Sequence, residues 1–287
     1  LVRLWRRPAS RFALIVLGLF LLAALYGEGV YRLARWRDYT PAYQRVHLEQ
    51  RYQPPGRQHP FGTDNLGRDV FQRVIQGARI AFHVALVASL IAVPLGTLLG
   101  ALGGYYGGRT DACVVWLYTT VAAMPGLLFI LAIALVAGKG LPGIYLGLGL
   151  TTWVGVCRLV RGEVMRQRAQ TYATAARALG LSSPRILFRH ILPNAFHVVI
   201  LTFSLRFPAA IGTEVLISFL GLGVQGEPSW GVMINNARLR LWQGVWWEMA
   251  AVTLAISLVV LACNLVGDLL RDELDPQSRT TGCAKSQ

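Results

Sequence analysis

Few residues of this 287-residue chain have the types and spacing that bond chemistry requires. The four cysteines include no C-x-x-C pair, and His190 and His197 lie seven residues apart without a third ligand beside them. A phosphate-binding loop needs G-x-x-x-x-G-K-S/T, and the nearest approach, Gly138-Lys139-Gly140, lacks the first glycine and the hydroxyl residue. We therefore predict a chain that is not an enzyme, with no catalytic residues, no metal site and no cofactor of its own.

Three ionisable side chains stand inside long apolar stretches: His83, Arg206 and Glu214. A charge in the middle of a membrane helix costs roughly 2.5–3.5 kcal/mol on insertion scales, so such residues usually face a cavity or a partner. Arg206 and Glu214 are eight residues apart, about two helical turns, which is too far for an ordinary direct pair. All three are candidate residues of a translocation pathway. A hydrogen bond from Glu214 that holds the helix bundle together is equally compatible with the pattern.

The elements that must position these residues are long apolar runs. Hydrophobic residues make up 54% of the chain and charged residues 15%, against about 25% charged in a soluble domain. A run of about 20 apolar residues crosses a bilayer, and its amides must pair within helices because the hydrocarbon core holds no water. Six runs occur, at 12–31, 80–104, 112–137, 141–158, 194–222 and 248–270. The sequence therefore predicts an all-α integral membrane protein with six transmembrane helices.

The domain organisation follows from these runs. Residues 1–79 hold an N-terminal arm, the first span and an outer loop, residues 80–276 hold a five-helix core, and residues 277–287 form a tail. No convincing cleavage site follows the first run, so we expect it to be retained as a span rather than removed as a signal peptide.

Two groups of residues are expected at the outer surface. Residues 61–79 are predicted to form an amphipathic helix on the bilayer surface, capped by Thr63 or Asp64, because its apolar residues share one helical face. The tryptophans that precede and begin the last run are expected to be interfacial aromatics rather than substrate contacts. They are Trp230, Trp242, Trp246 and Trp247.

The net charge of +14 does not indicate a nucleic-acid partner. The basic residues are scattered among the loops between spans, whereas a nucleic-acid interface gathers them on one face of a domain. The positive-inside rule places the N-terminal arm and the basic segment between the fourth and fifth runs in the cytoplasm. The first outer loop, about 32–79, is also rich in arginine, so charge alone leaves the orientation of the first span open.

The polar segment between the fourth and fifth runs, Tyr172 to Asn194, is basic and rich in alanine. Gly180 is suited to end a short helix, because glycine takes the left-handed cap conformation without steric cost. Ser183 followed by Pro184 predicts an N-cap and a first-turn proline, so a second helix starts there. Small side chains at 173, 175, 176 and 178 would let another protein's surface approach closely. We therefore predict a helix, a break and a re-entry into the membrane.

Four groups of motifs, in this order, resemble those of ATP-binding-cassette importer permeases, and more narrowly those of the peptide/nickel branch. They are HPFGTDNLGRDVF at 59–71; Ala175-Ala176 with Gly180 and RHILPN at 189–194; SFLGLGV at 218–224 with PSWGVMIN at 228–235; and NLVGDLLRDELDP at 264–276. The resemblance implies the six-helix type I permease fold in a bacterial inner membrane, with both termini cytoplasmic. It also implies the shorter permease of a heterodimer.

The resemblance further implies the partners and the mechanism. A second permease, two ATP-binding subunits that use ATP and Mg, and an extracytoplasmic substrate-binding protein would complete an importer of di- or oligopeptides in the lipid bilayer. The loop 159–193 would couple ATP hydrolysis to the pathway. The ATPase-coupling residues that it implies are Tyr172, Thr174, Ala175, Ala176, Arg177, Leu179, Gly180, Pro184 and His190.

Three positions depart from the family pattern. Thr174 stands where glutamate is usual, Thr171 where an acid is frequent, and Thr119 where aspartate is common. In the coupling segment, either the packing positions persist without the acids or the partner ATPase carries an altered surface charge.

Other functions stay open. The same branch could import nickel or another small solute. An ion-coupled transporter would use Arg206, Glu214 and His83 as a proton relay. A membrane scaffold would bind no ATPase at all.

Overall fold

The computed structural model describes residues 8–138, 140–224 and 226–274, and most of them are helical. Five helical stretches are long and apolar enough to cross a membrane, and a bent pair makes a sixth candidate span. The predicted all-α membrane fold is confirmed, while the tail at 277–287 and most of the N-terminal arm lie outside the described residues. The stretches are α1 (Pro8–Arg37), α2 (Val70–Tyr106), the pair α3 (Gly108–Ala123) and α4 (Gly126–Ala137), α5 (Leu141–Arg168), the joined α7 (Ser183–Ile186), η4 (Leu187–Ile191) and α8 (Leu192–Phe219), and α10 (Trp247–Leu274).

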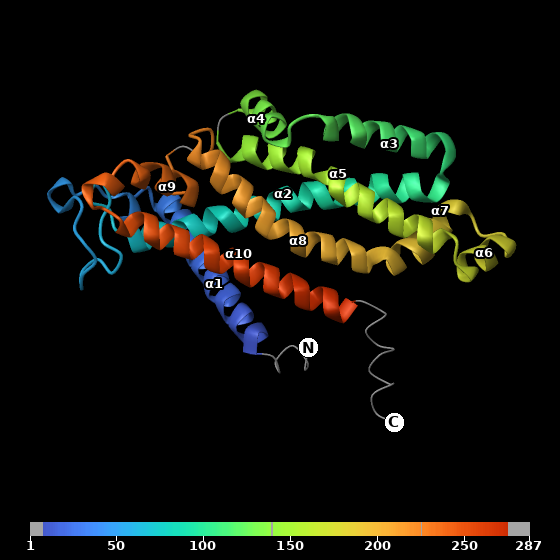
Figure 1. Cartoon of the computed structure of the whole chain (residues 1–287), viewed down its shortest axis with the longest axis horizontal. Coiled ribbons are helices and arrows are strands. Elements are labelled where there is room, and N and C mark those ends of the chain that lie inside the picture. Colours follow the sequence, from blue (N-terminus) through green and yellow to red (C-terminus); the bar gives the residue numbers. More distant parts are fainter. Residues whose placement is uncertain (1–7, 139, 225, 275–287) are drawn as a thin grey trace.

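The α2, α5, α8 and α10 helices run along the longest axis of the molecule (Figure 1). The α2–α5 pair is the most extensive, and α8 packs on both of its helices. One end of the molecule carries the short α6 helix (Thr171–Ala178), and the opposite end carries α9 (Trp230–Arg238) and the segment 38–69. Three single-turn helices complete the description: η2 (Ala42–Gln44), η3 (Leu48–Gln50) and η5 (Leu241–Gln243).

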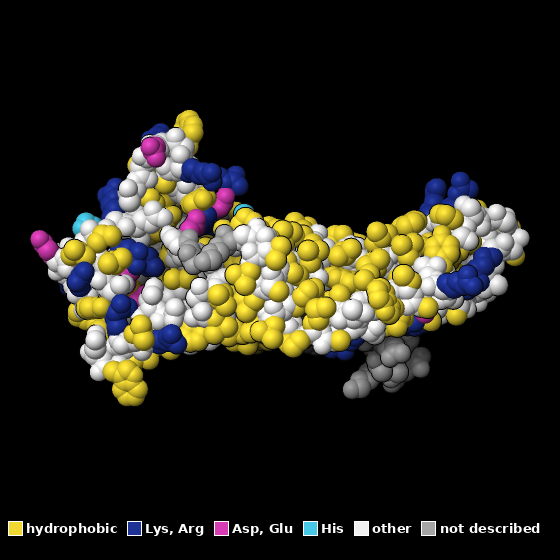
Figure 2. Space-filling view, turned by 90° about the horizontal axis from the view of Figure 1, so that it is seen from above, with side chains coloured by type: hydrophobic (Ala, Val, Ile, Leu, Met, Phe, Trp, Pro, Cys, Tyr) yellow, Lys and Arg dark blue, Asp and Glu magenta, His cyan; other side chains and the backbone are white. Residues whose placement is uncertain are grey.

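Side chains sort by polarity along the same axis. Figure 2 shows a central band of hydrophobic side chains, with the charged side chains gathered toward the two ends. Large apolar side chains are exposed in the spans themselves: Leu22 and Leu25 of α1 are 64% and 60% exposed. An apolar belt of this extent is unfavourable in water and favourable in a bilayer, so it marks the part of the molecule that faces lipid.

Glycines at every fourth position of α2 let its backbone touch that of α5. A Cβ atom added at Gly96, Gly100 or Gly104 would lie 2.6–2.7 Å from a carbonyl oxygen of α5. No ordinary side chain fits that space, and small residues are what allow membrane helices to approach closely. The valines beside this contact, Val156, Val160 and Val164, are fully buried. This close contact, the seam of Gly96, Gly100 and Gly104, fixes the position of α5, which leads directly into α6.

The third predicted span, 112–137, is not one continuous helix. The α3 and α4 helices meet at 92° across Met124 and Pro125. A proline disfavours helical conformation in the residue before it, and Met124 is extended, with φ −81° and ψ 139°. Pro125 therefore breaks the span that the apolar composition predicted.

The expectation of a separate amphipathic helix over 61–79 is wrong. α2 begins at Val70 and continues through residue 106, so the expected boundary at 79/80 falls inside one helix. Val70 is fully buried in the core, so it faces neither lipid nor water. The cap is Asp69, whose carboxylate accepts a hydrogen bond from the amide of Gln72 at 3.0 Å.

The buried carboxylate of Asp64 organises the turn that precedes α2. It accepts hydrogen bonds from the amides of Leu66 and Arg68 at 2.8 and 2.9 Å and pairs with Arg68 Nε at 2.7 Å. An aspartate that bonds the amide two residues ahead stabilises a turn. Asp64 therefore serves this turn instead of a helix N-terminus. Thr63, the other predicted cap, donates its hydroxyl to the carbonyl of Gln50 and accepts from the amide of Gln53, so neither residue caps a helix.

Two of the four tryptophans are internal rather than interfacial. Trp230 is fully buried and its Nε1–H donates to the carbonyl of Val74 at 3.0 Å. Trp247 is buried and donates to the carbonyl of Thr63 at 3.0 Å. A buried indole with its N–H satisfied is a packing element, so the interfacial prediction is wrong for both. Trp242 and Trp246 are 96% and 58% exposed, and for them it stays a prediction.

Candidate coupling segment and translocation residues

The short helix α6 has a complete cap at its C-terminal end. Gly180 has φ +77°, in the left-handed region. The Gly180 amide donates to the carbonyl of Arg177 at 3.0 Å, and the Leu181 amide donates to that of Ala176 at 3.2 Å. These two bonds are those of a Schellman motif. The prediction that Gly180 ends this helix is confirmed.

The next helix begins one residue earlier than predicted. Ser182, not Ser183, is the N-cap residue, and Ser183 and Pro184 occupy the first two helical positions. Proline is tolerated there because the first amides of a helix have no partner within it. His190 follows in the π-helix η4, and its carbonyl accepts a hydrogen bond from Asn194 Nδ2 at 2.9 Å. The chain thus re-enters the apolar band directly after the break.

One face of α6 is packed into the protein. Ala173 and Ala176 are buried, in one apolar cluster with Val164 of α5, Ile186 of α7 and Leu187 of η4. Two of the four alanines expected to admit a partner protein therefore serve internal packing. Positions 175 and 178 are exposed.

Two hydrogen bonds tie α6 to the end of α5. The Tyr172 hydroxyl donates to Gln167 Oε1 at 2.9 Å. The Arg177 guanidinium donates to the carbonyl of Arg168 at 3.0 Å. Together with the apolar cluster, these bonds hold α6 against the end of α5 and the start of the α7–α8 stretch.

The other face of α6 is presented to the surroundings. Leu179, the residue that follows α6, is 81% exposed. Thr174 and Ala175 lie beside it, both exposed. The Thr174 hydroxyl donates a hydrogen bond to the carbonyl of Gln170 at 3.4 Å, and the side chain contributes no charge. The exposed face is thus apolar and small at its centre, with the charge of Arg177 at its edge.

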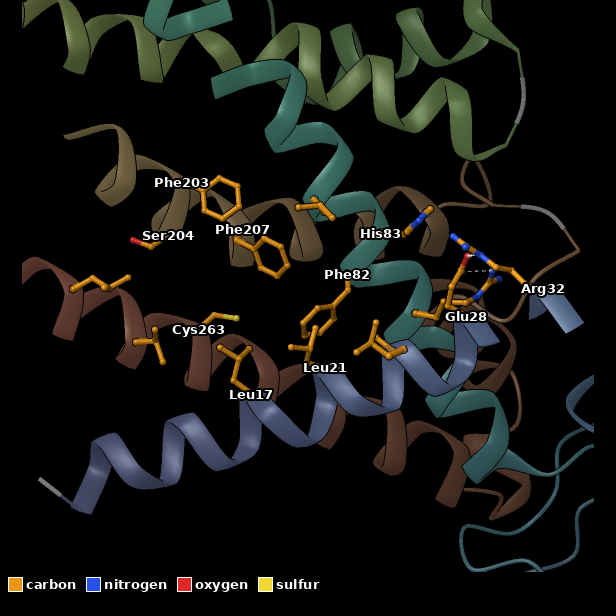
Figure 3. Close-up of a pocket in the computed structure, with 16 residues that line it drawn as sticks. Leu17, Leu21, Glu28, Arg32, Phe82, His83, Phe203, Ser204, Phe207 and Cys263 are labelled. Atoms are coloured by element: carbon orange, nitrogen blue, oxygen red, sulfur yellow. Dashed lines mark hydrogen bonds and ion pairs between the residues drawn. The ribbon is translucent and has the colours of Figure 1, made fainter. Parts of the chain in front are cut away.

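His83 borders a groove of about 560 Å³ between α1, α2, α8 and α10. Figure 3 shows Leu17, Leu21, Phe82, Phe203 and Phe207 along its apolar part, with His83, Glu28 and Arg32 together at one end. His83 Nδ1 lies 3.0 Å from the hydroxyl of Tyr145 on α5. His83 therefore links two helices at the polar end of an apolar groove.

Glu214 and Arg206 occupy different surroundings. Glu214 is fully buried and its Oε1 accepts a hydrogen bond from the hydroxyl of Ser218 at 2.7 Å, one turn further along α8. Arg206 is half-buried in a small recess of about 40 Å³ between α2, α5 and α8. His83 thus lines a groove and Arg206 lines a separate recess. Glu214 lies inside the core. This separation does not favour a proton relay through the three.

Comparison with known proteins identifies the family. Residues 92–280 match the family described as binding-protein-dependent transport system inner membrane component. The chain is 38% identical to the dipeptide transport system permease protein of Bacillus subtilis (strain 168) over 276 residues, which are 96% of this chain and 85% of that protein. The chain belongs to this family.

Other relatives and solved structures agree. The permease is 37% identical over 276 residues to the glutathione transport system permease protein of Escherichia coli O6:K15:H31 (strain 536 / UPEC), covering 95% of this chain and 89% of that protein. Its fold resembles a chain of the inward-facing MetNI methionine ABC transporter, with TM-score 0.55 and 15% identity over 72% of this chain and 96% of that chain. The fold is therefore that of a type I importer permease.

Sequence reasoning missed the ion pairs of the described residues, and one of them centres on Arg79. Arg79 pairs with Glu227 and, at 3.6 Å, with Glu28, and it stacks on the ring of Tyr31 with 4.0 Å to the centroid. It thereby joins α1 and α2 to the loop before α9. Glu28 interrupts the first apolar run, which is the one sequence signal that could have suggested a partner.

Another missed ion pair joins α3 to α5 at the α6 end of the permease. Arg161 holds Asp111 through two bonds, Nε–Oδ1 at 2.5 Å and Nη2–Oδ2 at 2.6 Å. A bidentate pair of this kind fixes orientation as well as distance. The partners are 50 positions apart, and nothing in the spacing of the sequence pairs them.

Proposed function

We propose that this permease is one of two permease subunits of an ATP-driven importer, and that its cargo is a di- or oligopeptide. The observation that carries the proposal is α6: a short helix that exposes Leu179 and is locked through its other face to α5 and α7. The relatives named for dipeptide and glutathione transport support the cargo class. ATP and Mg would be used by partner subunits.

Coupling would work as motion of a rigid body. An ATPase subunit that grips the exposed face of α6 pulls on α5 and the α7–α8 stretch together, because cluster contacts and two hydrogen bonds prevent α6 from moving alone. Rigid-body transitions of this kind convert a local contact into a global change of state. The seam of Gly96, Gly100 and Gly104 passes the motion on to α2.

The topology of the spans supports the orientation that we propose. If α6 faces the ATPases, α5 runs toward the cytoplasm and α8 away from it. Counting α3 and α4 as one span then places both termini in the cytoplasm and α9 on the outer side, where a substrate-binding protein would dock. The arginines near α6 agree with the positive-inside rule.

The proposal is tested by purifying the tagged permease gently from its native membrane and identifying what accompanies it by mass spectrometry. Two ATP-binding subunits, or one kind in two copies, and a second permease are expected. The recovered complex is then placed in liposomes with its binding protein, and ATP-dependent uptake of dialanine, glutathione and Ni²⁺ is compared. Uptake of Ni²⁺ without uptake of either peptide would overturn the cargo, and uptake driven by a proton gradient without ATP would overturn the ATP coupling.

A further inference from the structure

Arg206 is an arginine in the middle of a membrane helix. It lies 14 residues after the first residue of α8 and 13 before the last, which at about 1.5 Å per residue is roughly 20 Å from either end. Desolvating an arginine at that depth is costly, and such residues face a cavity and find a counter-charge. Contact with lipid therefore does not explain an arginine at this position.

No carboxylate among the described residues provides that counter-charge. Arg206 takes part in none of the ion pairs of the described chain, and its Nε is buried without a hydrogen-bond partner. Glu214, the nearest acid along α8, is fully buried and bonded to Ser218. The guanidinium is thus charged, half-buried and unpaired within the part of this chain that the structure describes.

Arg206 borders a small recess between α2, α5 and α8. Gly155 of α5 makes room for the guanidinium, because a Cβ atom at that position would overlap its Nη2 atom. The recess beside it is walled by alanines and by the hydroxyl residues Ser89, Thr152 and Thr213, from α2, α5 and α8. The small wall residues leave space next to the charge, so the guanidinium is the group that an entering anion would meet. The hydroxyls of Thr152 and Thr213 donate to the carbonyls of Leu148 and Ala209, at 2.7 and 2.9 Å.

We propose that Arg206 is a carboxylate-binding residue of the pathway, and that it pairs transiently with the C-terminal carboxylate of a passing peptide. Every unmodified linear peptide carries that group, whereas its side chains vary, so one fixed guanidinium serves cargo of any sequence. Arg–carboxylate contacts are charge-assisted and geometrically specific. The inference rests on the proposed function, because it needs a peptide in the pathway.

The first consequence concerns transport. In the complete importer, Arg206→Gln should lower uptake of dialanine at least tenfold while the binding protein still stimulates ATP hydrolysis. Arg206→Lys, which keeps the charge, should lose much less. Loss of stimulated ATP hydrolysis in the native complex would instead count against the proposed function, so the two failures are distinguishable.

The direct test measures the charge that the recess presents. The cysteines at 113, 157, 263 and 283 are replaced, Thr213→Cys is introduced, and the complete importer is reconstituted in liposomes. The rates of modification by an anionic reagent, 2-sulfonatoethyl methanethiosulfonate, and a cationic one, 2-(trimethylammonium)ethyl methanethiosulfonate, are then compared. We expect the anionic-to-cationic rate ratio to fall at least tenfold with Arg206→Gln, to persist with Arg206→Lys, and dialanine to slow the reaction more than dialanine amide does.

Three results would overturn the proposal. A ratio unchanged by Arg206→Gln would mean that an acid of the partner permease already neutralises the guanidinium. No reaction with either reagent, in a complex that still hydrolyses ATP in response to its binding protein, would mean that the recess is closed to water. Equal protection by dialanine and its amide would mean that the carboxylate is not what Arg206 contacts.

Discussion

Replacing Gly100 by alanine tests whether backbone contact between α2 and α5 holds the permease together. The added Cβ would lie 2.6 Å from the carbonyl oxygen of Cys157, about 0.8 Å short of the 3.4 Å at which ordinary van der Waals contact begins. It would also lie 3.0 Å from the amide nitrogen of Arg161. Both obstacles are backbone atoms in a helix, so the two helices must separate rather than a side chain rotate away.

The magnitude follows from that separation. A gap of 0.5–1 Å forfeits roughly a quarter to a half of the dispersion energy of the atoms along it, and overpacking costs about 1–3 kcal/mol. Because the obstacles are backbone atoms, the upper part of that range applies, about 2–3 kcal/mol. Alanine regains about 1 kcal/mol of helix propensity, which leaves a net loss of roughly 1–2 kcal/mol. The same exchange at Gly162 of α5, where nothing lies within 4 Å, should be neutral or stabilising.

The assay is thermal unfolding of the purified complex in detergent, followed by tryptophan fluorescence, with wild type, Gly100→Ala and Gly162→Ala side by side. We expect the midpoint to fall for Gly100→Ala and to hold or rise for Gly162→Ala. Equal or higher stability of Gly100→Ala would refute the reasoning, because the seam would then tolerate an extra carbon.

Three further predictions use the same assay. Trp230→Phe should cost about 1 kcal/mol, because it removes the hydrogen bond to the carbonyl of Val74 at 3.0 Å but keeps most of the packing, and a cost as large as that of Trp230→Ala would contradict this division. Asp64→Ala should cost more, about 3 kcal/mol, since it leaves a partly buried Arg68 and two amides without their acceptor. Limited proteolysis should then cut within 38–69, and an uncut loop would contradict the role of Asp64 as the centre of this turn. Asp111→Asn should weaken the bidentate contact of Arg161 by about 1 kcal/mol, and an unchanged midpoint would show that the pair does not fix α3.

The sequence was most informative where one local rule sufficed. Long apolar runs determined the spans, and Gly180 predicted its own left-handed cap, because both depend on composition or on the conformation of one residue. The bend at Pro125 also has a local cause, but a span predicted from apolar composition alone did not reveal it. Weighing the residue before the proline would have found it.

The failures came from tertiary contacts. Aspartate is a common helix N-cap, yet Asp64 is buried and accepts hydrogen bonds from two nearby amides, which make it the centre of a turn. Trp230 has the character of an interfacial residue, yet α9 brings it inside to a carbonyl of α2 that is 156 positions away. Of the candidate pathway residues, the sequence could find Arg206 as a misplaced charge, but only the packing of Gly155 shows the recess beside it.

The central claim, that the exposed face of α6 couples this permease to ATP hydrolysis, is tested most directly at Leu179. The measurement is ATP hydrolysis stimulated by the binding protein, together with uptake, in liposomes containing the complete importer with Leu179→Asp or Leu179→Met. Burying a carboxylate in place of an apolar side chain should weaken docking by about 2 kcal/mol or more, which exceeds a tenfold loss of affinity. We predict that Leu179→Asp releases the ATPases and abolishes uptake while Leu179→Met retains both, and full uptake by the Leu179→Asp importer would contradict the account.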